Sequence, residues 1–157
     1  MPTIKLKDLD QSFKYDIAKR PGGENFKSCF TCGTCTASCP VAEVNEEYDP
    51  RRIIRMSVMG MREAVLSSEL LWMCQRCYVC YARCPQNVKF ADVMGILREM
   101  AVEEGYAKPE MIRDIEELDR RVQDLRCRLV SNLIEPEKYK VNRVKEKLDE
   151  IIESENG

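Results

Sequence analysis

Eight of the nine cysteines fall into two copies of one spaced motif, C-x2-C-x2-C-x3-C-P. This spacing is typical of chains that bind two [4Fe–4S] clusters, because each x2 step lets three thiolates reach three irons of one cubane. The proline after each copy fixes φ and carries no N–H, so it turns the chain out of the motif. The first copy is Cys29, Cys32, Cys35, Cys39 and Pro40, and the second is Cys74, Cys77, Cys80, Cys84 and Pro85.

The fourth cysteine of each copy is expected to bind the cluster of the other copy, because it faces away from its own. Each copy is then one ligand short without its partner, which explains why the motif occurs twice. With all eight thiolates in use, neither cluster has an open iron, and the predicted chemistry is electron transfer rather than substrate conversion. The predicted ligand sets are Cys29, Cys32 and Cys35 with Cys84, and Cys74, Cys77 and Cys80 with Cys39.

Two other uses of these cysteines are less consistent with the sequence. A disulfide framework needs an oxidising compartment, no export signal opens the chain, and C-x2-C pairs rarely bridge internally. Structural zinc is usually held by two separated C-x2-C pairs, so the third and fourth cysteine of each copy would have no role. The ninth cysteine, Cys127, lies in a charged helical stretch, and a plain structural thiol is favoured over a reactive one.

Composition excludes several function classes. The chain has no histidine, so His-based metal sites, His general bases and Ser-His-Asp chemistry are excluded. Its 25 basic and 27 acidic residues give a charge of −2. Two clusters would each add about −2, which argues against a nucleic-acid-binding surface. No G-x-G-x-x-G fingerprint occurs, so no flavin or nicotinamide site is expected here. No apolar run of about 18 residues occurs, so we expect a cytoplasmic chain without a membrane span.

Apolar spacing and turn residues predict a mainly α fold in three parts: an N-terminal arm (1–28), a two-cluster domain (29–106) and a C-terminal helical extension (107–157). Short helices are expected at Phe13–Lys19, from Asp49-Pro50 onward with Ile54, Val58 and Met61 on one face, and at Met61–Ser68. A longer amphipathic helix should carry Phe90, Val93, Met94, Leu97 and Ala101, end at Gly105 and pack on the second motif.

The extension is expected to form an α-hairpin. Its first helix starts at Pro109 with a near-heptad apolar seam, and Glu135-Pro136 breaks it. Its second helix places Val141, Val144, Leu148 and Ile151 on one face. The many charged residues of the extension indicate that its remaining faces are solvated.

The residues around the motifs resemble the C subunit of heterodisulfide reductase. The resemblance covers residues about 1–105 and is carried by Cys32-Gly33-Thr34-Cys35-Thr36-Ala37-Ser38-Cys39-Pro40-Val41, Asp49-Pro50-Arg51 and Trp72-Met73-Cys74-Gln75-Arg76-Cys77. It implies an α-helical ferredoxin fold. It also implies an electron-relay component of an oxidoreductase complex, which passes electrons from a flavin-containing A subunit to a disulfide-reducing B subunit. In methanogenesis the disulfide joins coenzyme M and coenzyme B.

The alternatives are a stand-alone ferredoxin-like carrier, the iron–sulfur subunit of a succinate, fumarate or glycerol-phosphate dehydrogenase, and a cluster-stabilised docking scaffold. A further expectation concerns the two potentials. Arg76 and Arg83 flank cysteines of the second motif, where positive charge favours the reduced, more negative cluster. The second cluster is therefore predicted to have the higher potential.

Overall fold

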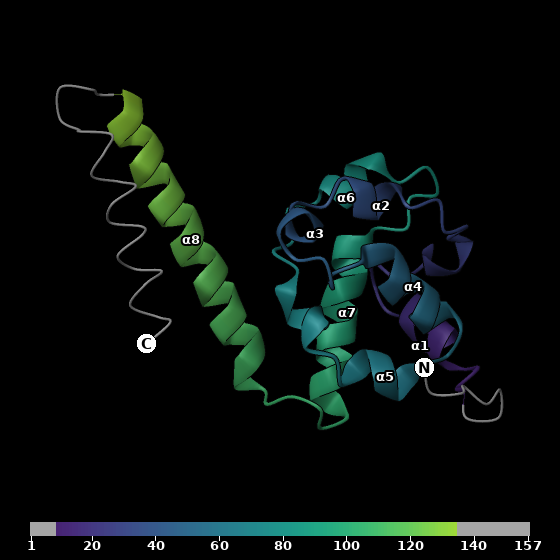
Figure 1. The fold of residues 1–157 in the computed structure, drawn as a ribbon. Helices are drawn as coiled ribbons and strands as arrows, with labels where there is room; N and C mark the ends of the chain where they lie inside the picture. Colours follow the sequence, from purple (N-terminus) through teal and green to yellow (C-terminus); the bar gives the residue numbers. More distant parts are fainter. Residues whose placement is uncertain (1–8, 135–157) are drawn as a thin grey trace. The chain divides into compact units, whose positions relative to one another are not determined.

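The computed structural model describes residues 9–134, which form helices and loops with no β-strand in that range. The chain divides into two compact units that meet between Ile112 and Arg113. Figure 1 shows the helices in sequence colours. They are, in order, α1 (Phe13–Lys19), the 3₁₀ helix η2 (Phe26–Ser28), α2 (Thr34–Ala37), α3 (Pro40–Val44), α4 (Pro50–Val58), α5 (Arg62–Leu66), the 3₁₀ helix η3 (Glu69–Met73), α6 (Val79–Arg83), α7 (Phe90–Glu103) and α8 (Glu110–Ile134).

Helix α7 lies at the centre of the first unit. Its apolar spacing buries most of its length, and α1, α5, α6 and η3 all pack against it. Figure 1 shows α2 and α6 together at one end of α7 and α5 at the other. The helix predicted from Phe90 is thus confirmed; its last helical residue is Glu103, and Gly105 follows with a φ of +79°. Such a left-handed glycine is a common way to end a helix.

Helix α1 has the bounds predicted from the sequence and joins this core through Phe13 and Ile17, both 0% exposed. A charged network holds its solvent side in place. Arg62 at the start of α5 donates hydrogen bonds to Asp16 on α1 at 3.0 Å and to Glu104 at the end of α7 at 2.7 Å. The guanidinium therefore links three helices that are far apart in the sequence.

Helix α4 begins at the predicted signal. The Asp49 side chain accepts a hydrogen bond from the Arg52 N–H at 3.1 Å, and Pro50 occupies the first helical position. This cap satisfies an N–H that has no partner within the helix.

The predicted apolar face of α4 is only partly right. Ile54 is buried, but the other buried side chains of the helix are Pro50, Ile53 and Ser57, while Val58 is half-buried. The reason is that α4 contacts α1, α2 and α5, so a wide arc of its surface is covered. Ser57 is accommodated because its hydroxyl donates to the Ile53 carbonyl at 2.8 Å.

Helix α8 starts one residue after Pro109, as predicted, and runs through Ile134. Its outer surface carries ion pairs one turn apart, such as Arg121 with Glu117 at 2.8 Å. Its seam residues Leu118 and Val122 are about half exposed. The predicted hairpin partner helix lies outside the described residues. No helix within residues 9–134 is both long and apolar enough to cross a bilayer.

Candidate metal centres

The two cysteine motifs fold with the same backbone. Thr31 and Gly33 of the first motif have φ values of 58° and 85°, and their counterparts Arg76 and Tyr78 have values of 50° and 60°. Left-handed backbone is unfavourable for residues with a Cβ, and three of these four have one. The repeat in the sequence is therefore also a repeat in backbone conformation, imposed against local preference.

Backbone N–H groups point toward cysteine sulfurs in this conformation. The N–H of Thr31 donates to Cys29 Sγ at 3.4 Å, and the N–H of Val88 donates to Cys84 Sγ at 3.3 Å. Hydrogen bonds of this kind favour the thiolate over the thiol. At Cys29 this hydrogen bond opposes the effect of burial, which is larger and raises the pKa of the thiol.

The third cysteine of each motif lies on a one-turn helix. Cys35 is on α2 and Cys80 is on α6, and these two helices pack against each other. Figure 1 shows them side by side. Because the motifs meet through these helices, sulfurs from both copies come within reach of a common site.

Two hollows lie between the motifs, and each is lined by cysteines from both copies. Each hollow lies mainly against one motif, and we name it after the fourth cysteine of the other motif. The Cys84 hollow holds about 360 Å³ of empty space and the Cys39 hollow about 310 Å³, solvent-open parts included. The cysteines of the Cys84 hollow are Cys29, Cys32, Cys35, Cys80 and Cys84, and those of the Cys39 hollow are Cys39, Cys74, Cys77 and Cys80.

Each hollow contains the four cysteines that the spacing predicts to share a cluster, and the Cys84 hollow contains Cys80 as well. In each hollow, three cysteines of one motif lie with the fourth cysteine of the other. Cys80 and Phe90 line both hollows, so the two spaces are direct neighbours. The assignment of individual cysteines as ligands stays a prediction. Cys127, by contrast, is an exposed residue of α8 and lines neither hollow.

The spacing of these side chains suits a cluster better than a single ion. A tetrahedral zinc with Zn–S bonds of about 2.3 Å requires sulfurs about 3.8 Å apart. Among residues 9–134, no three Cys, Asp or Glu side chains converge closely enough to hold one ion. Four thiols that do not converge on one point instead suit a cubane, whose irons stand between the sulfurs.

Burial makes the thiolate form of these cysteines unfavourable unless a cation is bound. It raises the pKa of Cys35 and Cys74 and raises the pKa of Cys80 to about 12. A buried thiolate is costly without a positive partner, and iron would supply that charge. Exposed Cys32 differs, because the Thr34 hydroxyl at 3.3 Å lowers the pKa of its thiol.

Residues outside the motifs hold the cysteine loops in place, and sequence reasoning missed them. The Arg98 guanidinium on α7 is 5% exposed and donates to the carbonyls of Leu71 at 2.9 Å, Trp72 at 3.2 Å and Cys74 at 2.6 Å. It thereby fixes the stretch that leads into the second motif. One signal in the sequence could have identified Arg98. It is a charged residue next to Leu97, within a helix that is predicted to be largely buried.

The first motif is tied down by the start of α4. The Thr36 hydroxyl on α2 donates to Asp49 Oδ1 at 2.5 Å and accepts from the Arg51 N–H at 3.0 Å. The cap at Asp49 was predicted, but its bond to Thr36 was not. One carboxylate therefore starts a helix and also orients the first cysteine loop.

Comparison with known proteins agrees with this geometry. The family described as 4Fe-4S dicluster domain matches residues 25–88, which include both motifs. Residues 25–88 form a 4Fe–4S dicluster domain. The chain accordingly binds two [4Fe–4S] clusters, in an α-helical fold of the two-cluster ferredoxin type.

The chain is also a relative of the heterodisulfide reductase C subunits. It is 40% identical over 106 residues to the C subunit of the H(2):CoB-CoM heterodisulfide,ferredoxin reductase of Methanothermobacter thermautotrophicus, covering 68% of this chain and 56% of that protein. It is 42% identical over 110 residues to the iron-sulfur C subunit of the CoB--CoM heterodisulfide reductase of Methanopyrus kandleri, covering 66% and 57%.

A third relative is the C2 subunit of the H(2)/formate:CoB-CoM heterodisulfide,ferredoxin reductase of Methanococcus maripaludis, 37% identical over 114 residues. The match covers 68% of this chain and 61% of that protein. The chain thus spans less than two thirds of the length of these relatives. The likeness extends well beyond the cysteine spacing, since the aligned stretches are longer than the dicluster domain.

Proposed function

We propose that the chain is the electron-transfer component of a heterodisulfide-reductase-type complex. In this proposal it accepts electrons from a flavin-containing A subunit and delivers them to the B subunit, which reduces a disulfide such as that of coenzyme M and coenzyme B. The names of the relatives support the type of complex. The proposal includes a location in the cytoplasm, where thiols stay reduced.

One observation carries the relay role: the two cysteine hollows are neighbours, and each reaches the surface. Cys80 and Phe90 line both, while Cys32 in one hollow and Cys77 in the other are exposed. The clusters supply one-electron chemistry when bound. The chain itself places the side chains of Cys80 and Phe90 at both hollows and leaves one cysteine of each hollow exposed to a partner.

Each motif carries an exposed aromatic residue directly after one of its cysteines in the sequence. Phe30, next to Cys29, is 56% exposed, and Tyr78, next to Cys77, is 43% exposed. Exposed aromatic residues are enriched where proteins contact one another. We assign these residues to the contact surfaces for the two partner subunits.

The ligand sets form part of the proposal, with Cys29, Cys32, Cys35 and Cys84 around one cluster and Cys74, Cys77, Cys80 and Cys39 around the other. The crossing is tested with serine variants. If Cys84 serves the first motif, the EPR spectrum of anaerobically reduced Cys84→Ser should match that of Cys32→Ser. A match to Cys77→Ser instead would refute the crossing. Cys127→Ser is the control and should retain the wild-type spectrum.

The relay is tested by purifying the tagged chain anaerobically with its native partners. We expect a flavoprotein and a cysteine-rich protein in the complex, and bleaching of this chain's visible absorption when the flavoprotein is reduced. Subsequent addition of a disulfide substrate should restore the absorption. A complex in which the flavoprotein is reduced but this chain's absorption never changes would refute the relay and support a docking scaffold.

Other outcomes identify the alternatives. Recovery of a lone chain that is reduced and reoxidised by soluble proteins would indicate a stand-alone ferredoxin-like carrier. Recovery with a succinate, fumarate or glycerol-phosphate dehydrogenase would indicate an iron–sulfur subunit of that enzyme.

A further inference from the structure

Tyr48 carries a buried hydroxyl that has no hydrogen-bond partner among the described residues. It lies between α3 and α4, outside both cysteine motifs, and only 1% of the residue is exposed. Its backbone is fixed, because its N–H donates to the Asn45 carbonyl at 3.1 Å. A buried hydroxyl without a partner is destabilising, so it requires an acceptor that the oxygen atoms of residues 9–134 do not provide.

The Tyr48 side chain lines the Cys39 hollow and is not among the residues that line the Cys84 hollow. The Tyr48 hydroxyl does not meet any thiol with the geometry of a hydrogen bond. The hydroxyl and the Cys74 thiol are nevertheless close enough to affect each other's pKa. Burial, with the nearby sulfurs of Cys74 and Cys39, raises the pKa of Tyr48 far above its ordinary value. The phenol therefore keeps its proton and is available as a donor.

Arg76 presents a second unpartnered donor to the same hollow. Its Nε is buried and has no acceptor among the described residues, and the side chain lines the Cys39 hollow. The guanidinium is held from its other end, where Nη2 donates to the Tyr78 hydroxyl at 3.0 Å. Within residues 9–134, these are the two buried side-chain polar atoms without a partner, and both line one hollow.

We propose that the Tyr48 hydroxyl donates a hydrogen bond to a sulfur in the Cys39 hollow and, together with Arg76 Nε, raises the reduction potential of the cluster bound there. The inference rests on the proposed ligand sets. A donor facing sulfur stabilises the reduced state more than the oxidised state, because the reduced cluster carries one more negative charge. The Cys84 hollow has donors of its own, because the N–H groups of Thr31 and Val88 donate to the sulfurs of Cys29 and Cys84.

The test is an anaerobic redox titration of the isolated holoprotein, followed by EPR, for wild type and Tyr48→Phe. Phenylalanine keeps the ring and removes only the donor. We expect the transition of the cluster whose EPR signal changes in Cys77→Ser to fall by about 59 mV, equivalent to a tenfold change in the oxidised-to-reduced ratio, while the other transition stays in place. Tyr106→Phe is the matched control, since Tyr106 is 43% exposed and lines neither hollow.

A second readout detects the bond itself. In the reduced wild type, the exchangeable hydroxyl proton of Tyr48 should couple to the same cluster, and this coupling should be absent in Tyr48→Phe and present in Tyr106→Phe. The proposal is overturned if Tyr48→Phe retains its iron and both potentials equal those of the control. It is also overturned if the two transitions shift together, because a general loosening would produce that result.

A second variant, expected to shift the reduction potential in the opposite direction, tests the proposal if Tyr48→Phe does not retain its clusters. Placing 3-fluorotyrosine at position 48 makes the phenol a stronger donor with little change in its shape, so the transition of the cluster whose EPR signal changes in Cys77→Ser should rise. No change, or a fall, overturns the proposal. All of these measurements use the isolated chain, so their failure is distinct from a failure to find or reduce partner subunits.

Discussion

Replacing Arg98 with Met should destabilise the first unit more than any ordinary surface substitution. Methionine retains an unbranched apolar stem but removes the guanidinium. Three carbonyls then lose their donor, those of Leu71, Trp72 and Cys74. The bonds to Leu71 and Cys74 are fully buried, so water cannot easily replace them.

The size of the effect follows from these contacts. A hydrogen bond to a charged donor contributes about 1.5–3 kcal/mol, and a buried acceptor left unpaired costs about 1–3 kcal/mol. Partial relaxation and the weaker, part-buried bond to Trp72 reduce the sum, so we expect a loss of about 3–5 kcal/mol in the free energy of unfolding. With a urea m-value of about 2 kcal/mol/M, the unfolding midpoint falls by about 1.5–2.5 M.

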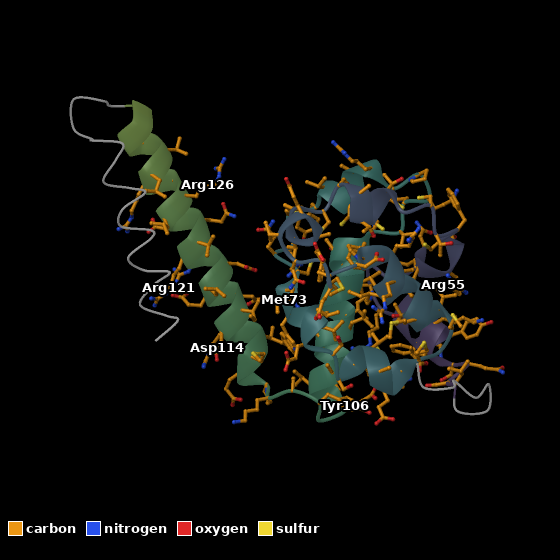
Figure 2. The ribbon with its side chains drawn as sticks, in the orientation of Figure 1. Arg55, Met73, Tyr106, Asp114, Arg121 and Arg126 are labelled. Atoms are coloured by element: carbon orange, nitrogen blue, oxygen red, sulfur yellow. The ribbon has the colours of Figure 1, made fainter. Side chains whose placement is uncertain are left out.

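The assay is anaerobic urea unfolding of the holoprotein, followed by far-ultraviolet circular dichroism. Arg55→Met is the control, because Arg55 is an exposed residue of α4, labelled in Figure 2, and its loss should change the free energy by no more than about 0.5 kcal/mol. Equal midpoints for Arg98→Met and Arg55→Met would refute the argument that Arg98 holds the second motif.

Three further predictions concern other contacts. Gly60→Ala should lose at least about 2 kcal/mol in urea unfolding, because φ is +85° and the new Cβ would lie 2.3 Å from a backbone oxygen, whereas Gly95→Ala in open space should gain about 0.5–1 kcal/mol. A loss at Gly95 would contradict this. Arg62 holds the pKa of Asp16 below its ordinary value, so its contribution is complete above about pH 5 and disappears as pH falls below the ordinary pKa. The gap in urea midpoint between wild type and Arg62→Met should therefore narrow toward pH 3, and a widening gap would contradict it. Cys127→Ser should retain its full iron content, and loss of iron would contradict the exposed, non-ligand position of Cys127.

The parts of the fold that sequence patterns predicted are those with a local cause. Asp49-Pro50 signals a helix start because a cap and a proline act on neighbouring residues. The spacing of apolar residues from Phe90 likewise predicts a buried helix face. The cysteine spacing predicted that three cysteines of one motif would lie near the fourth cysteine of the other, because the geometry of a cubane is encoded in the intervals.

The missed features depend on segments that meet only in three dimensions. Tyr48 looks like any aromatic residue before a helix, and its place at the Cys39 hollow arises when the loop between the motifs packs over the second one. The bond between Thr36 and Asp49 spans 13 residues and crosses from one helix to another. The face of α4 was partly misjudged because three neighbouring helices cover it, which widens the buried arc beyond one stripe.

The central claim is that eight cysteines in two shared hollows bind two [4Fe–4S] clusters. Iron and acid-labile sulfide analysis of the anaerobically purified chain, combined with EPR of its reduced form, tests it most directly. We predict about eight irons and eight sulfides per chain, with signals from two interacting centres. A colourless protein that contains zinc, or about four irons and a single isolated signal, would contradict the account.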